Sequence, residues 1–308
     1  MAEPAGFSES AQELLEERYE VVRPQTPPRD LAEALRDHEV VWIRLGYAID
    51  ASTVAQAERC RTIVCPATGL DHVDEAACRR AGIRVLALRG EREFLRRIRA
   101  TSEHALGLLL ACLRKTCTAN RHVRDGGWDR DRFVGRELFE SQALVIGHGR
   151  LGSIMCDCLV AMGAEVTVYD PDPAVAVPPT VARSHDLREA AQRCDVASVH
   201  VNLCAETELL VSREVLAAFR PHVCLVNTSR GRLVDEVALV EVLEADRLAA
   251  YAADVVWNEH AGEDSPLVAY AQTGAENVII TPHIGGKTVE SVARTELFMA
   301  EKLLASDG

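Results

Sequence analysis

A glycine-rich segment offers the clearest chemistry in the chain. Gly147, Gly149 and Gly152 stand in GxGxxG spacing within QALVIGHGRLGSIMCDCLVAMGAEVTVYD, and Asp170 follows 23 positions after the first glycine. The pattern predicts a strand before the glycines, a helix after them and a second strand that ends at Asp170. In a dinucleotide site the first glycine allows a tight turn, the second lets the backbone approach the pyrophosphate, and the third lets helix and strand pack closely. The phosphates would meet the positive end of the helix.

Asp170 indicates which dinucleotide would bind. A carboxylate at this position can accept hydrogen bonds from the ribose hydroxyls of the adenosine, and it repels a 2′-phosphate. Neither Pro171 nor Asp172 supplies a cation that would hold such a phosphate. The sequence therefore favours NAD over NADP. The alternative interpretation is an ordinary βαβ turn with incidental glycines.

Three polar segments follow later strands of the same predicted series. They are NTSRG (227–231), ADVVWNE (253–259) and TPHIGG (281–286). Open α/β sheets bind ligands at the carboxyl ends of their strands, so we expect Arg230, Glu259 and His283 at one edge. Taken singly, each could instead be a surface arginine, a solvated glutamate or a core histidine.

Together these segments resemble the D-isomer-specific 2-hydroxyacid dehydrogenase family, and in particular its phosphoglycerate dehydrogenase-like members. The resemblance covers nearly the whole chain, in several motifs that follow the family's order. The motifs are ATGLDHVD, ATSEHALGLLLACLRK, VNTSRGRLVDEVALVEVL, AADVVWNE and NVIITPHIGGKT.

The resemblance implies NAD-dependent interconversion of a 2-keto acid and the D-2-hydroxy acid. Such a reaction needs an acid or base for the hydroxyl proton and a cation for the carboxylate and carbonyl. By resemblance His283 is the acid/base, and Glu259 hydrogen-bonds its far nitrogen, which fixes the tautomer and favours the protonated ring. Arg230 would hold the planar carboxylate and carbonyl in a bidentate grip.

Further site residues are assigned by resemblance alone. Beyond the glycines and Asp170, the expected cofactor contacts are Arg150, Leu151, Thr207, Thr228, Ser229, Arg230, Asp254, His283 and Gly285. Backbone groups of Arg150 and Leu151 would face the pyrophosphate, the Thr–Ser pair of NTSRG would line the nicotinamide ring, and Asp254 would meet its carboxamide. Backbone amides around Thr68 and Gly69 resemble the family's loop for the substrate carboxylate. No metal ligand set is expected.

The arginines of the chain indicate a chemical class of substrate but not its identity. Arg44, in VVWIRLG, stands where phosphoglycerate-type members of the family carry an arginine for a distal phosphate. Five more arginines lie between positions 89 and 99. The functional interpretation is that the substrate is a 2-keto or 2-hydroxy acid with a second anionic group. The residues that would bind this substrate are Arg44, Thr68, Gly69, Arg230 and His283. The alternative is that these basic residues form a solvated face.

Alternating apolar runs and helical patterns must position these residues. The first series predicts strands at 19–22, 39–43, 62–65 and 83–86, with helices at 11–20 and near 29–37, 51–59 and 74–81. After a helix at 98–115, N-capped by Ser102, the second series predicts strands at 142–146, 164–169, 195–200, 222–227, 249–254 and 277–281. A final helix covers 288–305. Strands alternating with helices indicate parallel sheets.

The resulting fold class is α/β with two doubly wound parallel-sheet domains. A Rossmann-type cofactor domain (100–283) is inserted into a flavodoxin-like substrate domain (1–99 plus 284–308). Three departures from the family pattern affect local geometry rather than chemistry. His260 and Asn202 stand where the family usually has proline, and the segment before Gln12 hardly provides the usual first strand.

Composition excludes several classes of protein. With 308 residues, of which 48% are hydrophobic, the chain can fill two domain cores. A net charge of -13 argues against nucleic acid as a partner. The longest apolar stretch (105–113) is too short to cross a bilayer, and the start of the chain shows no secretory signal, so we expect a cytoplasmic protein. Ten scattered cysteines without CxxC spacing are expected to be reduced apolar fillers.

The segment ALGLLLACL is apolar nearly all round, more than one packing face requires. We therefore expect a homodimer built on the nucleotide domain, through the 101–117 helix and the loop that contains Trp128, and the family resemblance implies the same. The competing functional hypothesis is an NAD(H)-sensing regulatory protein, because the family includes a transcriptional corepressor that keeps the same three site residues.

Overall fold

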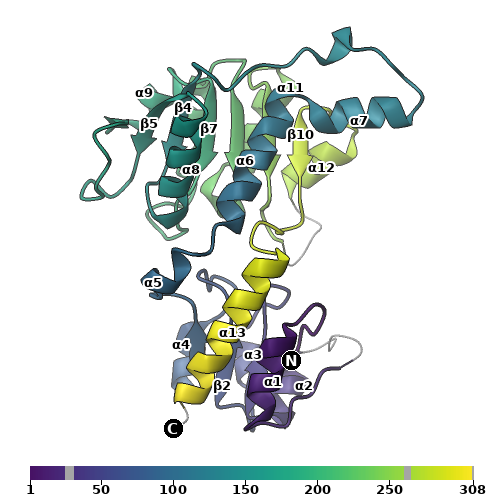
Figure 1. Cartoon of the computed structure of the whole chain (residues 1–308), viewed down its shortest axis with the longest axis vertical. Coiled ribbons are helices and arrows are strands. Elements are labelled where there is room, and N and C mark those ends of the chain that lie inside the picture. Colours follow the sequence, from purple (N-terminus) through teal and green to yellow (C-terminus); the bar gives the residue numbers. More distant parts are fainter. Residues whose placement is uncertain (25–30, 260–264, 307–308) are drawn as a thin grey trace. The chain divides into compact units, whose positions relative to one another are not determined.

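The chain divides into two compact units in this computed structural model (Figure 1). Unit 1 comprises residues 1–98 and 287–308, and unit 2 comprises residues 99–286. The structure describes residues 1–24, 31–259 and 265–306. The boundaries predicted from the sequence, at 99/100 and 283/284, lie close to these divisions.

Unit 1 contains a parallel sheet of short, buried strands in the order β1-β2-β3. The strands are β1 (Val40–Trp42), β2 (Thr62–Cys65) and β3 (Arg84–Ala87). The helices are α1 (Glu9–Glu16), α2 (Leu31–Asp37), α3 (Ala51–Val54), α4 (Glu75–Arg80), α5 (Arg92–Leu95) and α13 (Val289–Ser306).

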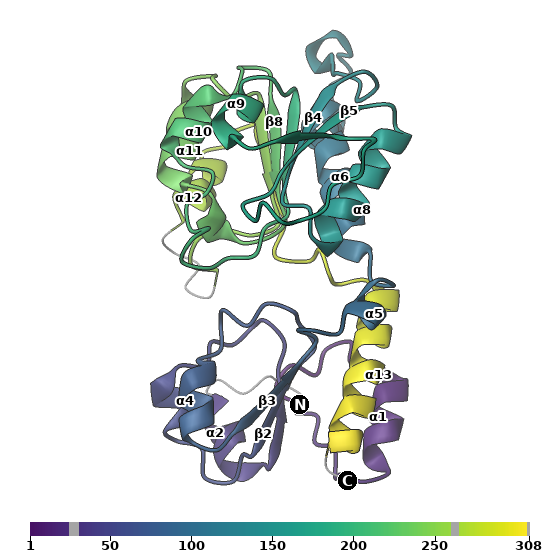
Figure 2. The same ribbon diagram turned by 90° about the vertical axis from the view of Figure 1, so that its left-hand side faces the viewer.

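Alternation along the strands gives this sheet a core on each face. Val41 and Ile63 pack with α2, α3 and α4, whereas Trp42 and Val64 pack with α1 and α13. Figure 2 shows α13 and α1 on one side of β2 and β3, and α2 and α4 on the other. Unit 1 is therefore wound on both faces, as the sequence predicted.

The predicted strand at 19–22 is wrong. After α1 and a turn at residues 17–18, residues 19–22 form a bend and irregular backbone, and the sheet in the described part of unit 1 has three strands. Tyr19 and Val21 are partly buried against the α1–α13 core. Their apolar character is thus satisfied by packing against a helix pair rather than by pairing in a sheet.

The described residues of unit 2 form seven parallel strands in the order β10-β9-β8-β7-β4-β5-β6. They are β4 (Gln142–Ile146), β5 (Glu165–Tyr169), β6 (Ala182–Ser184), β7 (Val196–Val199), β8 (Cys224–Asn227), β9 (Ala250–Ala253) and β10 (Val278–Ile280). Six of them confirm the predicted series. The sequence did not predict β6, a short edge strand without an apolar run.

Helices cover both faces of this sheet. Its helical segments are α6 (Ala100–Leu113), α7 (Thr116–Arg124), η1 (Asp131–Phe133), α8 (Arg150–Ala161), α9 (Leu187–Ala191), α10 (Arg213–Ala218), η2 (Gly231–Leu233), α11 (Glu236–Glu244) and α12 (Pro266–Gln272). Side chains of α6 and α8 pack on one face, and those of α9 to α12 on the other (Figure 2). The predicted α/β class with parallel sheets is confirmed.

Two predictions about α6 and the cysteines can be compared with the structure. Ser102 is not the N-cap of α6; Arg99 is, while the buried Ser102 hydroxyl donates to the carbonyl of Leu151 over 3.1 Å. All ten cysteines are free, and seven are buried. Burial raises the pKa of Cys156 and Cys194 to about 12. Among the described helices, none is long and apolar enough to cross a membrane.

Candidate active site

Parallel strands place the loops that carry the candidate catalytic and cofactor-binding residues at one edge of the unit 2 sheet. The glycine loop follows β4, Asp170 follows β5, and Arg230 follows β8. The Glu259 loop follows β9 and the His283 turn follows β10, and β8, β9 and β10 are neighbours in the sheet. The carboxyl edge of one sheet therefore gathers the cofactor fingerprint and the three candidate catalytic residues.

The glycine loop leaves room for a ligand because its glycines have no side chains. Gly147 has φ of +95°, and an added Cβ would lie 2.6 Å from the carbonyl oxygen of His200. A Cβ on Gly152 would overlap the carbonyl oxygen of Gly147, whereas a Cβ on Gly149 would meet open space. Gly149 is also the N-cap of α8, so unpaired N–H groups border this space. The loop fits a pyrophosphate.

Asp170 is held beside this loop. Its carboxylate accepts hydrogen bonds from the backbone N–H of His148 over 2.6 Å and of Asp172 over 2.9 Å. These bonds fix its position one strand away from the glycine turn and leave acceptor capacity on both oxygens, since a carboxylate oxygen can accept more than one bond. The geometry suits the predicted contact with ribose hydroxyls.

Other predicted cofactor contacts have protein partners of their own. Arg150 and Leu151 begin α8, as expected for backbone contacts to a phosphate, and burial lowers the pKa of the Arg150 guanidinium. The hydroxyl of the buried Thr207 donates to the carbonyl of Asn202 over 2.7 Å and accepts from the N–H of Cys204. The carbonyl of Asn202, which replaces the family's proline, thus closes this loop. His260 lies outside the described residues.

The loop after β8 is organised by a buried asparagine that the sequence did not single out. The Asn227 amide donates to the carbonyl of Arg230 over 2.8 Å and accepts from the N–H of Ser229 over 2.9 Å. The Ser229 hydroxyl donates to Val199 over 2.8 Å. The Thr228 hydroxyl is buried without a hydrogen-bond partner among the described residues. An orphaned hydroxyl beside the predicted nicotinamide site fits a bound ligand group.

The structure brings His283 and Glu259, which the resemblance assigns as an acid–base pair, into direct contact. The Nδ1 atom of His283 lies 2.5 Å from Oε2 of Glu259, and each side chain is 24% exposed. With Nδ1 engaged by a carboxylate, Nε2 is the ring nitrogen that can exchange a proton with a substrate. Arg230, on the neighbouring β8 loop, is partly buried and donates from Nη1 to the carbonyl of Ser229 over 2.7 Å.

Asp254 anchors the His283 turn. Its carboxylate is 1% exposed and accepts bonds from the N–H of Ile284 over 2.8 Å, the N–H of Gly285 over 2.6 Å and the hydroxyl of Thr281 over 2.5 Å. The backbone of His283, at φ of +53°, donates to the carbonyl of Asp254 over 2.9 Å. These bonds hold a left-handed conformation that a histidine rarely adopts. The contact of Asp254 with the carboxamide stays a prediction from the resemblance.

The remaining predicted residues lie in unit 1. Thr68 and Gly69 lie on the loop after β2. Arg44 follows β1, and its guanidinium binds Oε1 of Glu296 over 2.5 Å and the carbonyls of Ala5 and Gly6.

The predicted substrate contact of Arg44 is therefore not supported, because a carboxylate that is 1% exposed already holds the arginine. The five arginines between positions 89 and 99 are all exposed, which favours the solvated-face interpretation.

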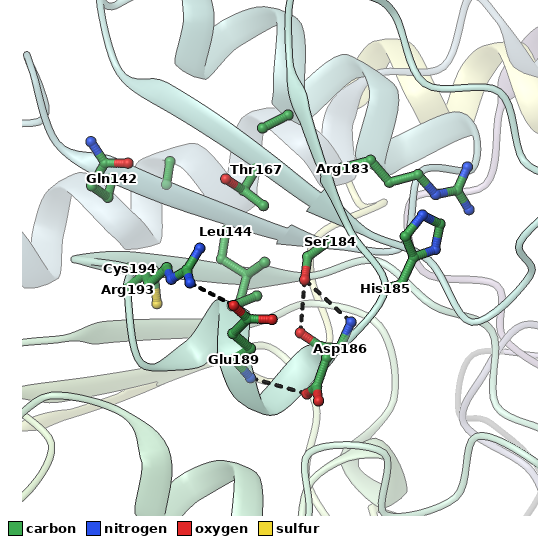
Figure 3. A pocket seen from close by; sticks show the side chains of 13 residues that line it. Gln142, Leu144, Thr167, Arg183, Ser184, His185, Asp186, Glu189, Arg193 and Cys194 are labelled. Carbon is green, nitrogen blue, oxygen red and sulfur yellow. Dashed lines mark hydrogen bonds and ion pairs between the residues drawn. The ribbon is translucent and has the colours of Figure 1, made fainter.

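A cavity of about 430 Å³ lies away from these residues (Figure 3). It is lined by residues of β4, β5, β6 and α9, with the Glu189–Arg193 ion pair and the Asp186 cap of α9 at its side. It contains none of the candidate site residues. Because α9 has only five residues, it leaves part of the sheet face uncovered.

Comparison with known proteins places the chain in a family. Residues 106–285 match the NAD binding domain, and residues 2–92 the catalytic domain, of D-isomer specific 2-hydroxyacid dehydrogenases. D-3-phosphoglycerate dehydrogenase of Mycobacterium tuberculosis is 34% identical over 292 residues, which are 94% of this chain and 53% of that protein. The chain thus spans about half the length of such curated relatives.

Two relatives match over nearly their full length. Hydroxypyruvate reductase of Thermotoga maritima is 28% identical over 95% of this chain and 92% of that protein. The crystal structure of a Thermus thermophilus protein superposes with a TM-score of 0.82 at 32% identity, over 97% of this chain and 94% of that one. The chain belongs to the D-isomer specific 2-hydroxyacid dehydrogenase family, and residues 106–285 are its NAD-binding domain.

Proposed function

We propose that this protein is an NAD-dependent dehydrogenase that interconverts a small 2-keto acid and the corresponding D-2-hydroxy acid. The observation that carries the proposal is the Glu259–His283 pair, 2.5 Å apart at the sheet edge that also presents the glycine loop and Arg230. The Nε2 atom of His283 gives a proton to the carbonyl oxygen in reduction and takes it back in oxidation. Arg230 binds the carboxylate and carbonyl and stabilises the developing negative charge.

NAD supplies the hydride acceptor or donor when it is bound. The residues that would hold it are the three glycines of the β4 loop, Asp170 and the Thr228–Ser229 pair, together with the first residues of α8. Thr68 and Gly69, on the loop after β2, stay predicted contacts for the substrate carboxylate. The Glu259 carboxylate engages Nδ1 of His283 and so orients the ring for proton exchange at Nε2.

The substrate class follows from the chemistry and from the relatives. A bidentate arginine beside a histidine acid selects a carboxylate next to a carbonyl. The names of relatives include D-3-phosphoglycerate dehydrogenase and hydroxypyruvate reductase, so we propose these two substrates as the first to test. Only the name D-3-phosphoglycerate dehydrogenase suggests a second anionic group on the substrate, because the guanidinium of Arg44 is already paired with Glu296.

The direct test is activity with hydroxypyruvate and NADH, and with D-3-phosphoglycerate and NAD, followed by NADH absorbance. His283→Ala should reduce turnover by about 10²- to 10⁴-fold and leave NADH affinity close to that of the parent protein. Arg230→Lys keeps the charge but loses the planar fork, so both KM and kcat should worsen. A His283→Ala variant within a few-fold of the parent would contradict the proposal. Inactivity of the parent towards all 2-keto acids, with tight NADH binding, would favour the regulatory alternative.

Glu259→Gln tests the carboxylate separately. The substitution removes the negative charge beside Nδ1 of His283 but keeps the side chain's size. The rate of keto acid reduction should therefore fall, and its pH profile should be displaced from that of the parent. An unchanged pH profile would mean that Glu259 does not act through His283.

We also propose a homodimer in which unit 2 provides the contact. Trp128, Val134 and Phe139, in the segment after α7, are 88%, 71% and 60% exposed. Clustering of large apolar side chains in one exposed segment supports a subunit interface there.

A further inference from the structure

Glu236 is a buried carboxylate that the proposed chemistry does not use. It stands in the first turn of α11 and is 1% exposed. A glutamate at this position of a helix normally lies in solvent, where it complements the helix dipole. Here Oε1 accepts from the backbone N–H of Trp257 over 2.6 Å, and Oε2 accepts from the hydroxyl of Ser265 over 2.6 Å. A longer bond of 3.5 Å comes from the N–H of Leu267.

These partners lie on both sides of the segment that carries Glu259. Trp257 is two residues before Glu259, and Asn258 between them is held at φ of +55°. Ser265 is the N-cap of α12 and accepts from the N–H of Val268 over 3.2 Å. One carboxylate thus ties the start of the Glu259 loop to its end, and a left-handed residue turns the chain towards the His283 contact.

The same contacts reach the Arg230 loop. The indole N–H of Trp257 donates to the carbonyl of Val234 over 2.9 Å, and the guanidinium of Arg232 lies 5.0 Å from the centre of the indole ring. A Cβ on Gly231 would overlap the backbone of Val256, so the two loops meet backbone to backbone. Trp257 is therefore packed between Glu236 and the loop that presents Arg230.

Burying this carboxylate is costly unless its bonds are made. Burial raises the pKa of Glu236, while the bonds from Ser265 and Trp257 act in the opposite direction. A buried acid with three hydrogen bonds fixes geometry in a way that an apolar residue cannot, because each bond has a direction. If the role were only to stabilise α11, bonds within that helix would suffice, and none of the three bonds is within it.

We propose that Glu236 is a positioning residue that sets Glu259 against His283. It holds the backbone of Trp257, which fixes Asn258 and thereby the direction of the Glu259 carboxylate. The inference rests on the proposed function, in which the Glu259–His283 pair performs the proton transfer. Glu236 itself touches neither member of that pair.

The first experiment compares Glu236→Ala with Glu236→Gln. The glutamine amide can accept from Trp257 and donate to Ser265, so this variant should stay within a few-fold of the parent in hydroxypyruvate reduction. The alanine variant should lose kcat by about 10- to 100-fold, as expected for a small displacement of a proton-transfer group. Its pH profile should move in the same direction as that of Glu259→Gln, while the Kd for NADH changes little. The matched control is Glu241→Ala, which removes an exposed glutamate of the same helix and should leave all three readouts unchanged.

The second experiment is a double-mutant cycle. If Glu236 acts through Glu259, then Glu236→Ala should cost little further activity in the Glu259→Gln background. Additive losses would show a general structural role and overturn the inference. If Glu236→Ala fails to fold, Ser265→Ala replaces it as the test variant, because it removes one of the three hydrogen bonds to Glu236. A Ser265→Ala variant with the pH profile of the parent would also overturn the inference. A silent Glu259→Gln would instead refute the proposed function itself.

Discussion

His200 should make unit 2 sensitive to mild acid. The residue follows β7 and lies against the glycine loop. A Cβ added to Gly147 would lie 2.6 Å from the carbonyl oxygen of His200, and a Cβ added to Gly152 would lie 3.3 Å from the Cβ of His200. The residue is 8% exposed. The Nε2 atom lies 2.8 Å from the hydroxyl of Ser198, and Nδ1 is buried without a partner among the described residues. Burial lowers the pKa of His200 from 6.5 to about 4. The ring is therefore neutral in the folded protein.

The size of the effect follows from linkage. In the unfolded chain the ring takes up a proton below pH 6.5, whereas the folded protein resists protonation down to about pH 4. Stability that is fully present above pH 6.5 is therefore lost as the pH falls towards 4. At about 1.4 kcal/mol per pH unit, the loss amounts to about 3 kcal/mol.

The assay is urea-induced unfolding of the parent and of His200→Gln across this pH range. Carboxylates titrate equally in both proteins, so the difference between their free energies of unfolding isolates His200. The variant should be less stable than the parent at neutral pH because its side chain packs less well. The difference between the two free energies of unfolding should narrow by about 3 kcal/mol as the pH falls. The matched control, His185→Gln, removes an exposed imidazole from the same unit. A gap that stays constant with pH for His200→Gln would refute the reasoning.

Three further predictions concern the cofactor, the assembly and unit 1. Asp170→Ala should narrow the preference for NADH over NADPH in binding titrations, and comparable affinities of the parent for both would contradict the assignment. Trp128→Glu should lower the mass measured by light scattering at micromolar concentration from dimer to monomer, so a monomeric parent would disprove the interface. Arg44→Ala should destabilise unit 1 by roughly 3 kcal/mol, because it removes the cation that pairs with buried Glu296. A change in substrate KM without a loss of thermal stability would show that Arg44 binds substrate after all.

Local patterns predicted most of the fold. Strands such as Thr62–Cys65 and Gln142–Ile146 are continuous apolar runs, which is how strands buried on both faces read. Ala182–Ser184 is an edge strand among the described residues and is only partly buried, so it lacks such a run and periodicity could not find it. Residues 19–22 have strand composition but pack against helices instead. Composition alone does not distinguish these two ways of burying a side chain.

The candidate site was predictable only where a motif spans consecutive residues. The glycine loop and TPHIGG are such motifs, and the spacing of the residues within each motif indicates its function. The partner of Arg44 lies 252 residues away in α13, so no local signal could show that the arginine is already engaged. Glu236 has the sequence signature of a surface residue at a helix start. Its burial depends on α12 folding back over α11, which is a tertiary event.

The distribution of cysteines makes this chain convenient for site-selective chemistry. A thiol reacts as the thiolate, and burial raises the pKa of Cys60 and Cys224 to about 11 and that of Cys156 and Cys194 to about 12. Cys117, on α7, and Cys204, in the loop after β7, are the two exposed thiols. A maleimide dye applied briefly at neutral pH should therefore attach to these two first. One dye would sit on α7, which precedes the segment proposed for subunit contact, and the other in the loop that carries Thr207, so the unmodified sequence already provides two optical reporters.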